Sequence, residues 1–472
     1  MTNPSSRSPG NTAILTVVVL SSFLVPFMMA ALNIALPSIG NDLELDAVML
    51  GWVATTYLLT AAVLLLPCGR AGDLYGRRIV FLYGMGTYTV GSFLSSLAPG
   101  ILSLLTARII QGIGGAMVFS TGTAILISAV APRNRGRALG WNVAAVYLGL
   151  SLGPVLGGII AHDLGWRWIF GLNAGAGLLA TLLTIRCLHD NTAEAVGKRF
   201  DFTGAGIYGW GLITFLYGCT RISDPVGPLC ILVSILSGIY FVRHELHTAS
   251  PLLDIRLVRT NLPFLLSNTA ALIHYAATAG LGFILSLYLV NIRGFTPRDA
   301  GWIMIAQPVM MTLFSPLAGR WSDRIPPWKL ASLGMSLTAI GLGTFCILQP
   351  DTPLWSIMTG LGILGFGFAL FSSPNTHAIM GSVEPRHYGM ASGILASMRS
   401  IGQMTSMAIV MMILTLVMGR GKTVLEAPEQ FGRSARIACA VFSALCVAGL
   451  FASLARGRKN TLATETTTIQ RL

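Results

Sequence analysis

Charged residues are scarce in this 472-residue chain. They make up 10% of it, whereas about a quarter is usual for soluble globular domains, and 53% of the residues are apolar, with a mean hydropathy of +0.70. This scarcity excludes an ordinary soluble domain and places most of the chain in lipid. The formal net charge of +13 does not indicate a nucleic-acid partner, because no basic patch with interleaved aromatic residues accompanies it.

Motifs for catalysis, metal binding and nucleotide binding are also missing. The sequence contains no nucleophile elbow, no Walker loop and no His/Glu metal pair. The seven cysteines are scattered without metal-ligand spacing, so we interpret them as packing residues; Cys219 and Cys230 are the one pair that could meet, across a predicted outer turn. The sequence therefore predicts neither an enzyme nor a resident cofactor or metal, and energy cannot come from ATP bound by this chain.

What the chain has instead is long apolar runs. A helix needs roughly 20 apolar residues to cross a hydrocarbon core of about 30 Å. The first run is longer than the roughly 7–15 residues of a signal-peptide core, and many others follow it, so we expect a retained helix. The sequence predicts an all-α polytopic membrane protein with fourteen spans, over residues 13–39, 48–68, 79–98, 101–129, 139–161, 168–187, 203–221, 227–243, 263–291, 300–318, 330–348, 355–380, 391–418 and 434–455.

The distribution of positive charge predicts the orientation of these spans. With the N-terminus in the cytoplasm, twenty-one Lys and Arg residues fall in inner loops and tails and eight fall in outer loops. This bias obeys the positive-inside rule, and anionic lipid facing the inner loops accounts for the basic net charge. We therefore expect a multi-pass protein of the cell membrane with both termini in the cytoplasm.

A short pattern occurs twice, about 250 residues apart, at the polar end of an apolar run each time. Such repetition indicates two homologous helical bundles, an architecture typical of membrane transporters. We predict a six-helix bundle at residues 13–187, a two-helix insert at 203–243 and a second six-helix bundle at 263–455. The two copies read Gly69-Arg70-Ala71-Gly72-Asp73 with Gly76-Arg77-Arg78, and Gly319-Arg320-Trp321-Ser322-Asp323 with Arg324.

These two loops are candidate gating elements. Their glycines allow a tight turn near a neighbouring helix, while Asp73 can accept from an arginine or face a helix N-terminus and so tie the bundles together in one state. The alternative is that the arginines only anchor the chain to the inner leaflet. In the second copy Pro326 and Pro327 replace the expected glycine and basic pair. The candidate gating residues are Gly69, Asp73, Gly76, Arg77, Arg78 and Asp323.

Further motifs accompany the loop pattern nearly from end to end. They are Leu104-x-x-x-Arg108-x-x-Gln111-Gly112-x-Gly114, Gly149-x-x-x-Gly153-Pro154-x-x-Gly157-Gly158, Asn33-Ile34-Ala35-Leu36-Pro37, Trp52 to Tyr57, Trp166 to Phe170, Ser373-Pro374-Asn375 and Ile379 to Ser382. With these motifs the chain resembles the major facilitator superfamily, and within it the fourteen-span drug:proton antiporters of the EmrB/QacA type. The extra hairpin at 203–243 is also typical of that branch. The resemblance implies efflux of small amphipathic compounds by proton antiport.

The predicted fifth span carries the pattern that this family associates with exporters. Gly149, Gly153 and Gly157 fall on one helix face and permit close helix contact, while Pro154 lacks a backbone donor and favours a kink. Gly158 completes the motif. A purely structural role in helix packing is equally compatible with these residues, so the direction of transport follows from the resemblance.

Two arginines lie inside predicted spans. Arg108 costs a few kcal/mol at membrane depth unless it faces a wet cavity or a partner, and Gln111 lies on the same helix face. Arg399 and Gln403 make a similar pair in span thirteen. We expect Arg108 to line a central cavity and to favour neutral or anionic substrates; the alternative for both arginines is a tether to backbone carbonyls of a neighbouring helix.

The sequence departs from its family in span one. The related proteins carry an acidic residue nine positions before the proline of the Ala-Leu-Pro element, where this chain has Met28, and Ala30 replaces a usual threonine. All eighteen acidic residues lie in predicted loops, tails or span edges. Proton coupling then needs another titratable group, and His274 is the histidine predicted at mid-depth. A hydrogen-bonded packing histidine is the alternative.

The remaining cavity candidates are Asn33, Tyr57, Gln307 and Asn375, polar groups within apolar spans that face a cavity or one another. We therefore expect a monomeric secondary transporter with a small-molecule substrate and the proton as partners. An exporter or exchanger of an anionic metabolite is the alternative function. A non-transporting receptor or scaffold would need a soluble sensing domain, and the predicted loops are too short for one.

Overall fold

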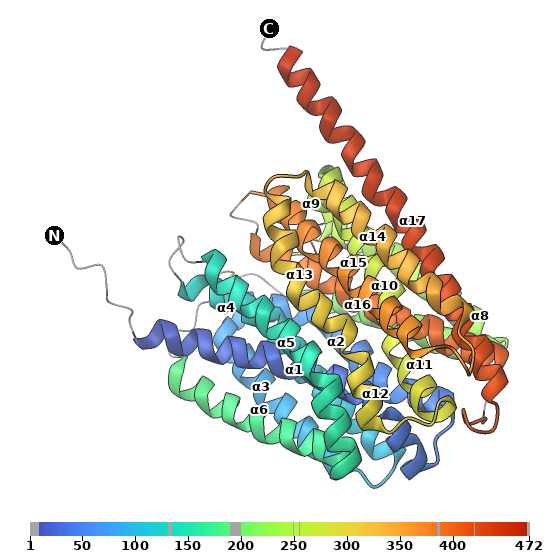
Figure 1. Cartoon of the computed structure of the whole chain (residues 1–472). Helices are drawn as coiled ribbons and strands as arrows, with labels where there is room; N and C mark the ends of the chain where they lie inside the picture. Colours follow the sequence, from blue (N-terminus) through green and yellow to red (C-terminus); the bar gives the residue numbers. More distant parts are fainter. Residues whose placement is uncertain are drawn as a thin grey trace.

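The computed structural model describes residues 9–130, 135–188, 200–248, 250–253, 255–384, 388–419 and 421–469, and it contains helices and connecting turns without a strand in those ranges. Figure 1 shows them. The helices are α1 (Pro9–Leu43), α2 (Ala47–Tyr75), α3 (Arg77–Ser96), α4 (Ile101–Ala129), α5 (Arg135–Asp163), α6 (Arg167–Cys187), α7 (Phe202–Thr220), α8 (Val226–His247), α9 (Ile255–Thr260), α10 (Leu262–Thr278), α11 (Leu281–Leu287), η2 (Tyr288–Ile292), α12 (Pro297–Met304), α13 (Ala306–Ser322), α14 (Pro327–Thr344), η3 (Phe345–Ile347), α15 (Leu354–Gly381), α16 (Tyr388–Val417) and α17 (Pro428–Ile469).

Helices α1 to α6 pack mainly against one another, and we call them the N-terminal helices. α1 lies along α5 and α6, α3 lies along α4 and α6, and α2 lies along α4. We use "outer" for the end at which α1 passes into α2, and "inner" for the end at which α2 passes into α3, following the predicted orientation. Parts of the predicted inner loops, residues 131–134, 189–199 and 385–387, lie outside the described residues.

Helices α10 to α17, the C-terminal helices, form a second group beside the first (Figure 1). Two of the predicted spans are interrupted here. The break between α10 and α11 lies at Gly280, whose amide N–H donates to Ser406 Oγ at 2.8 Å, and α12 passes into α13 at Ile305. A side-chain partner for the freed amide is what allows a helix to break at membrane depth.

The hairpin of α7 and α8 bridges the two groups. The two helices pack on each other, and α7 also packs against α2 and α16. Tyr208 Oη donates to the carbonyl of Ala62 in α2 at 3.0 Å, and Thr415 Oγ1 of α16 donates to the carbonyl of Thr220 at 3.4 Å. The insert therefore contacts both helix groups directly.

Twelve helices in the described part of the chain are long and apolar enough to cross a membrane, and they coincide with twelve predicted spans. The other two predicted spans, 79–98 and 203–221, coincide with α3 and α7, which are not among the twelve. Glycine, threonine and tyrosine dilute the apolar residues of both helices. The prediction of fourteen spans is therefore not confirmed, whereas an all-α polytopic fold is. The seven cysteines are free thiols.

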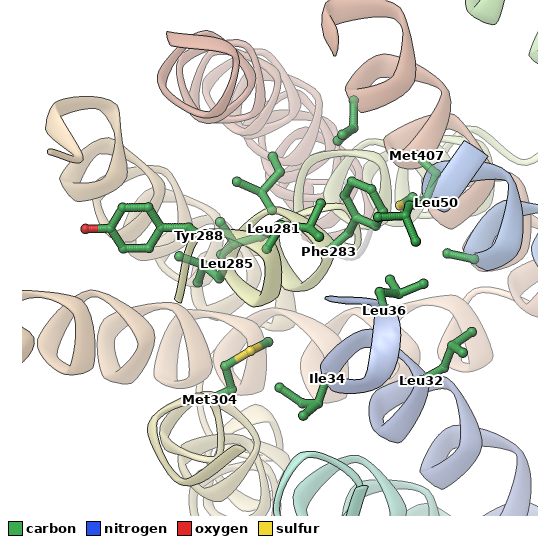
Figure 2. Packing of buried hydrophobic residues seen from close by; sticks show 14 of the residues in the cluster. Leu32, Ile34, Leu36, Leu50, Leu281, Phe283, Leu285, Tyr288, Met304 and Met407 are labelled. Carbon is green, nitrogen blue, oxygen red and sulfur yellow. The ribbon is translucent and has the colours of Figure 1, made fainter. Parts of the chain in front are cut away.

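The largest buried apolar cluster lies between the two helix groups. Its members at the interface come from the outer part of α1, the beginning of α2, the interrupted helix α11, α12 and α16, and the cluster continues into the outer parts of both groups, for example at Phe170 of α6 and Phe431 of α17. Because these side chains are almost fully buried and interdigitate, they close the outer half of the interface by van der Waals contact. Figure 2 labels members of this cluster: Leu32, Ile34, Leu36, Leu50, Leu281, Phe283, Leu285, Tyr288, Met304 and Met407.

Candidate functional site

The outer ends of the two helix groups are joined by two hydrogen bonds, one to the Asp46 side chain and one between backbone groups. Asp46, the N-cap of α2, accepts from the amide of Met49 through Oδ1 at 2.6 Å and from the amide of Gly421 through Oδ2 at 2.9 Å. The amide of Ala47 donates to the carbonyl of Lys422 at 3.3 Å. One carboxylate thus caps a helix of the first group and holds the α16–α17 loop of the second.

The glycines of α5 lie in close contact with α1, as the pattern predicts. A Cβ added at Gly149 would lie 2.5 Å from the Phe23 carbonyl oxygen, and one at Gly153 would lie 2.5 Å from Ala30 Cβ. Gly157 makes a similar approach to Ala31. The backbones can approach this closely because the glycines have no side chain.

The end of the same motif faces the other helix group, which the sequence does not reveal. A Cβ at Gly158 would lie 2.5 Å from the carbonyl oxygen of Pro297 at the start of α12. The carbonyl of Pro154 approaches Gly301 of α12 closely enough that no Cβ fits there. The α5 motif therefore packs on α1 with one face and forms part of the outer interface with α12.

A polar and aromatic cluster lies deeper in the interface, near the middle of α5 and α16 and in the inner third of α15. Tyr147 of α5 donates to Ser372 Oγ of α15 at 3.4 Å. Arg399 of α16 donates through Nη2 to Thr376 Oγ1 at 2.9 Å, and its guanidinium lies 5.5 Å from the ring centroid of Tyr275 in α10. We call these five residues the mid-depth cluster. Its position where the two groups meet, inward of the apolar cluster, is suited to a bound molecule.

Sequence reasoning found only Arg399 in this cluster. Tyr147, Ser372 and Thr376 are single polar groups in apolar spans, a signal that also marks many hydrogen bonds within helices. Arg399 Nε is buried without a hydrogen-bond partner in the described residues, so the guanidinium retains an unused donor. An unused donor beside an aromatic ring is a feature that a polar or anionic substrate could satisfy.

Arg108 lies inside the N-terminal helices and is 1% exposed. Its Nε donates to the carbonyl of Val53 in α2 at 3.3 Å, its Nη1 donates to Gln111 Oε1, and its guanidinium lies 4.8 Å from the Tyr57 ring centroid. Gln111 Nε2 in turn donates to Ser92 Oγ of α3 at 2.8 Å. These contacts connect α2, α3 and α4, which is the arrangement expected of an interhelical tether.

His274 is fully buried in the C-terminal helices. Its ring stacks on Phe371 with centroids 4.0 Å apart, and Nε2 lies 3.3 Å from Thr338 Oγ1. Nδ1 is buried and has no hydrogen-bond partner in the described part of the chain. His274 adjoins Tyr275 and Phe368, so it lies next to the mid-depth cluster.

The other predicted cavity residues are spread over both groups. Asn33 is half-buried, and its Nδ2 would lie 3.1 Å from a Cβ added at Gly282 of α11. Asn375 Nδ2 donates to the carbonyl of Ser267 at 3.0 Å, which ties α15 to α10. Gln307 is half-buried on α13, and the hydroxyl of Tyr57 is buried without a partner in the described residues.

In this structure each gating aspartate pairs with a basic residue of its own helix group. Asp73 Oδ1 accepts from Arg77 at 2.9 Å within the same loop. Gly76 has a φ of 105°, which favours glycine, and it lies between α2 and the start of α3 at Arg77 and Arg78; Gly69 is near the inner end of α2. In the second copy Asp323 lies 3.9 Å from His377 Nδ1. The two copies therefore pair their aspartates with different basic residues.

The family model described as Major Facilitator Superfamily matches residues 18–269 and 267–469. The chain is 29% identical over 393 residues to the riboflavin transporter RibZ of Clostridioides difficile (strain 630), with 82% of this chain and 85% of that protein covered. It is 32% identical over 406 residues to the uncharacterized transporter YebQ of Escherichia coli (strain K12), with 85% and 88% covered. It is 30% identical over 410 residues to the multidrug resistance protein Stp of Mycobacterium tuberculosis (strain CDC 1551 / Oshkosh), with 84% and 75% covered.

Solved structures show the same fold at low sequence identity. The peptide transporter POT in complex with alafosfalin superposes with a TM-score of 0.69 at 14% identity, covering 94% of this chain and 95% of that chain. A bacterial homolog of the human lysosomal transporter Spinster, in an inward-facing and unoccupied conformation, gives a TM-score of 0.69 at 14% identity and covers 96% and 98%.

Proposed function

Because the chain belongs to the Major Facilitator Superfamily, we propose that it exports small amphipathic compounds across the cell membrane in exchange for protons. The family consists of transporters, so the chain is a multi-pass membrane transporter of small molecules and not an enzyme. Relatives named as multidrug resistance proteins support drug-type efflux. The glycine motif of α5, which the family associates with exporters, supports the same direction.

The observation that carries this proposal is the mid-depth cluster at the interface of the two helix groups. Tyr147 of the N-terminal helices meets Ser372 and Tyr275 of the C-terminal helices beside the guanidinium of Arg399. A site assembled from both groups is exposed to one side or the other when the groups rock about it. Here the apolar cluster and the Asp46 hydrogen bonds hold the outer side together.

A second function is favoured by the charge of this cluster. In the described residues no acidic side chain lies in the middle of a candidate span, whereas Arg399 retains an unused donor. Coulomb attraction at membrane depth then favours neutral or anionic compounds over lipophilic cations. The alternative proposal is therefore an exporter or exchanger of an anionic metabolite, and the relative named as a riboflavin transporter shows that this group of proteins is not restricted to drugs.

We further propose that α3 and α7 cross the membrane too, giving fourteen spans in two six-helix bundles with a two-helix insert and cytoplasmic termini. α3 packs between α4 and α6, and α7 packs against α2 and α16, all of which are candidate spans. In this arrangement Asp73 would exchange Arg77 for a partner on the C-terminal helices when the inner side closes. Asn33, Gln307 and Arg399 retain their proposed roles at the cavity, whereas we propose that Arg108 is an interhelical tether.

Gradient discharge in everted membrane vesicles with an acidic interior tests both functions. Cationic, neutral and anionic amphipathic compounds are added in turn while the internal pH is followed, with vesicles that lack the protein as control. Discharge by cationic or neutral compounds supports proton-coupled drug export. Discharge by anions alone supports the anion exporter, and no discharge by any class contradicts proton antiport.

A further inference from the structure

Three titratable side chains meet at the inner end of the α7–α8 hairpin. Asp201 precedes α7 and caps it by accepting from the amide of Gly204 at 2.8 Å. His244, in the last turn of α8, places Nε2 3.1 Å and 3.0 Å from the two carboxylate oxygens of Asp201. Glu245 is the next residue of the same turn. We call these residues the inner triad.

Glu245 is 3% exposed, and its two carboxylate oxygens have different surroundings. Oε2 accepts from the amide of Leu253 at 2.9 Å, whereas Oε1 is buried without a hydrogen-bond partner in the described residues. An ionised carboxylate with a buried, unpaired oxygen carries a large desolvation cost. A bound proton, which neutralises the carboxylate and turns Oε1 into a hydrogen-bond donor, would remove that cost.

Gly204 shows where the unpaired oxygen points. A Cβ added there would lie 2.7 Å from Glu245 Oε1 and closer still to Asp201 Oδ2. The two carboxylates are therefore neighbours across the small space that the missing side chain leaves. This space suits a proton, because a hydroxyl formed on Oε1 could donate to the acceptor-only carboxylate of Asp201.

We propose that the inner triad is a proton-binding site. Its protonation controls how tightly the α7–α8 hairpin binds the segment around Leu253, which we call the linker and which leads from α8 to the C-terminal helices. The proton comes from hydronium at the inner surface: one O–H bond of the hydronium breaks, a water molecule is left, and an O–H bond forms at Glu245 Oε1. The new hydroxyl donates to Asp201. His244 is the more exposed member, with 23% of its side chain accessible against 7% for Asp201, and it provides the route to water.

The charged and polar groups that face Glu245 belong to the α7–α8 hairpin and to the linker that follows it. Asp201 faces it from α7 and His244 from α8, and the linker contributes the amides of Leu252 and Leu253. Leu253 belongs to two apolar clusters, one with residues of α7, α8, α2 and α16 and one with residues of α10, α15 and α16. Loss of the proton restores repulsion between the two carboxylates, which displaces the Glu245 carboxylate and breaks its hydrogen bond with the Leu253 amide.

Infrared difference spectroscopy of the purified full-length protein tests proton binding without any substrate, so its result is independent of the proposed function. As the pH is stepped, the wild type is expected to show a deuterium-sensitive C=O band of a buried protonated carboxyl. Glu245→Gln should remove this band, whereas Glu426→Gln, a change at an exposed outer carboxylate, should leave it. A pH-dependent band that persists in Glu245→Gln would overturn the proposal.

Limited trypsin cleavage after the exposed Arg259 tests the control of the linker. In Glu426→Gln, which corrects for the pH dependence of trypsin, cleavage should become about tenfold faster as the site deprotonates, because repulsion from Asp201 then displaces the Glu245 carboxylate from the Leu253 amide. Glu245→Gln mimics the protonated state and should be cleaved slowly at every pH, whereas Glu245→Ala should be cleaved rapidly at every pH. Cleavage of Glu245→Gln with the pH dependence of the control would contradict the coupling.

Discussion

Asp46 accepts hydrogen bonds from both helix groups at once, and its bond with Gly421 is the one that crosses the interface. The Gly421 amide lies 2.9 Å from Oδ2, while the Met49 amide lies 2.6 Å from Oδ1. Because each oxygen has its own partner, the helix cap and the contact between the groups can be separated by substitution.

Asp46→Ser keeps an oxygen for the α2 cap and removes the acceptor for Gly421. We expect outer closure to weaken by about 1 kcal/mol, which increases the outward-open population about fivefold. The measurement is labelling of an introduced Asn33→Cys by an impermeant maleimide from outside, in a protein without its native cysteines. Asp351→Asn, a change at an exposed carboxylate of another outer turn, serves as the control. Equal labelling rates in Asp46→Ser and the control would show that this hydrogen bond does not contribute to closure.

Gly158→Ala places a methyl group against the Pro297 carbonyl, where the available distance is 2.5 Å. Overpacking of this kind typically costs about 1–3 kcal/mol, so we expect faster Asn33→Cys labelling and slower transport. Gly175→Ala is the matched control, because a Cβ there has nothing within 4 Å. A Gly158→Ala protein that behaves like the Gly175→Ala protein would contradict a role for this contact in closing the outer side.

Arg399→Gln removes the guanidinium of the mid-depth cluster. If this group binds an anionic part of the substrate, the apparent KM for anionic compounds should rise at least about tenfold, while neutral compounds change little. Thr376→Val is a useful comparison, because it removes the acceptor of Arg399 Nη2 and leaves the charge in place. The same loss of affinity for neutral and anionic compounds in Arg399→Gln would indicate a structural role.

His274→Gln should abolish transport driven by a pH gradient and leave substrate binding intact, if His274 carries the coupled proton. The ring lies beside the mid-depth cluster and its Nδ1 has no partner in the described residues. A positive charge acquired on the ring would therefore act electrostatically on the residues of the cluster. Substrate binding and pH-driven uptake are measured on the same preparation. Unchanged pH dependence in the variant would leave His274 with a packing role.

Arg108→Ala should destabilise the N-terminal helices rather than weaken substrate binding. Its removal deprives the Val53 carbonyl and Gln111 of their partner, which we expect to cost about 1–3 kcal/mol and to lower the thermal transition. Transport by the remaining folded protein should retain its apparent affinity. A raised KM with an unchanged thermal transition would instead place Arg108 at the substrate.

Sequence reasoning located the helices well and their partners poorly. Fourteen apolar runs coincide with fourteen helical segments, because the length and apolarity of a run are local properties. Twelve of these segments are long and apolar enough to cross a membrane. The close approach of Gly149 and Gly153 to a neighbouring helix was also predicted, since small residues on one face have few other uses. That Gly158 faces α12, by contrast, depends on how the two groups are docked.

Glu245 and Asp201 show where sequence reasoning missed a candidate site. It placed both in inner loops or at span edges, where carboxylates are ordinarily solvated. The structure buries Glu245 against the linker that follows α8 and brings it beside Asp201, more than forty residues earlier in the chain. Burial at a helix end has no periodicity in the sequence, so no local signal distinguishes Glu245 from the exposed acids.

The sequence by itself determined that this protein is an all-α membrane transporter, and it predicts a duplicated unit, because hydrophobicity, motif spacing and charge bias are carried by neighbouring residues. Only the tertiary structure decided which polar groups meet: it brought Tyr147 to Ser372, Asp46 to Gly421 and His244 to Asp201. These pairs are distant along the chain. Their contact arises because polar groups in a membrane protein must find partners, and the packing of the helices determines which partner is within reach.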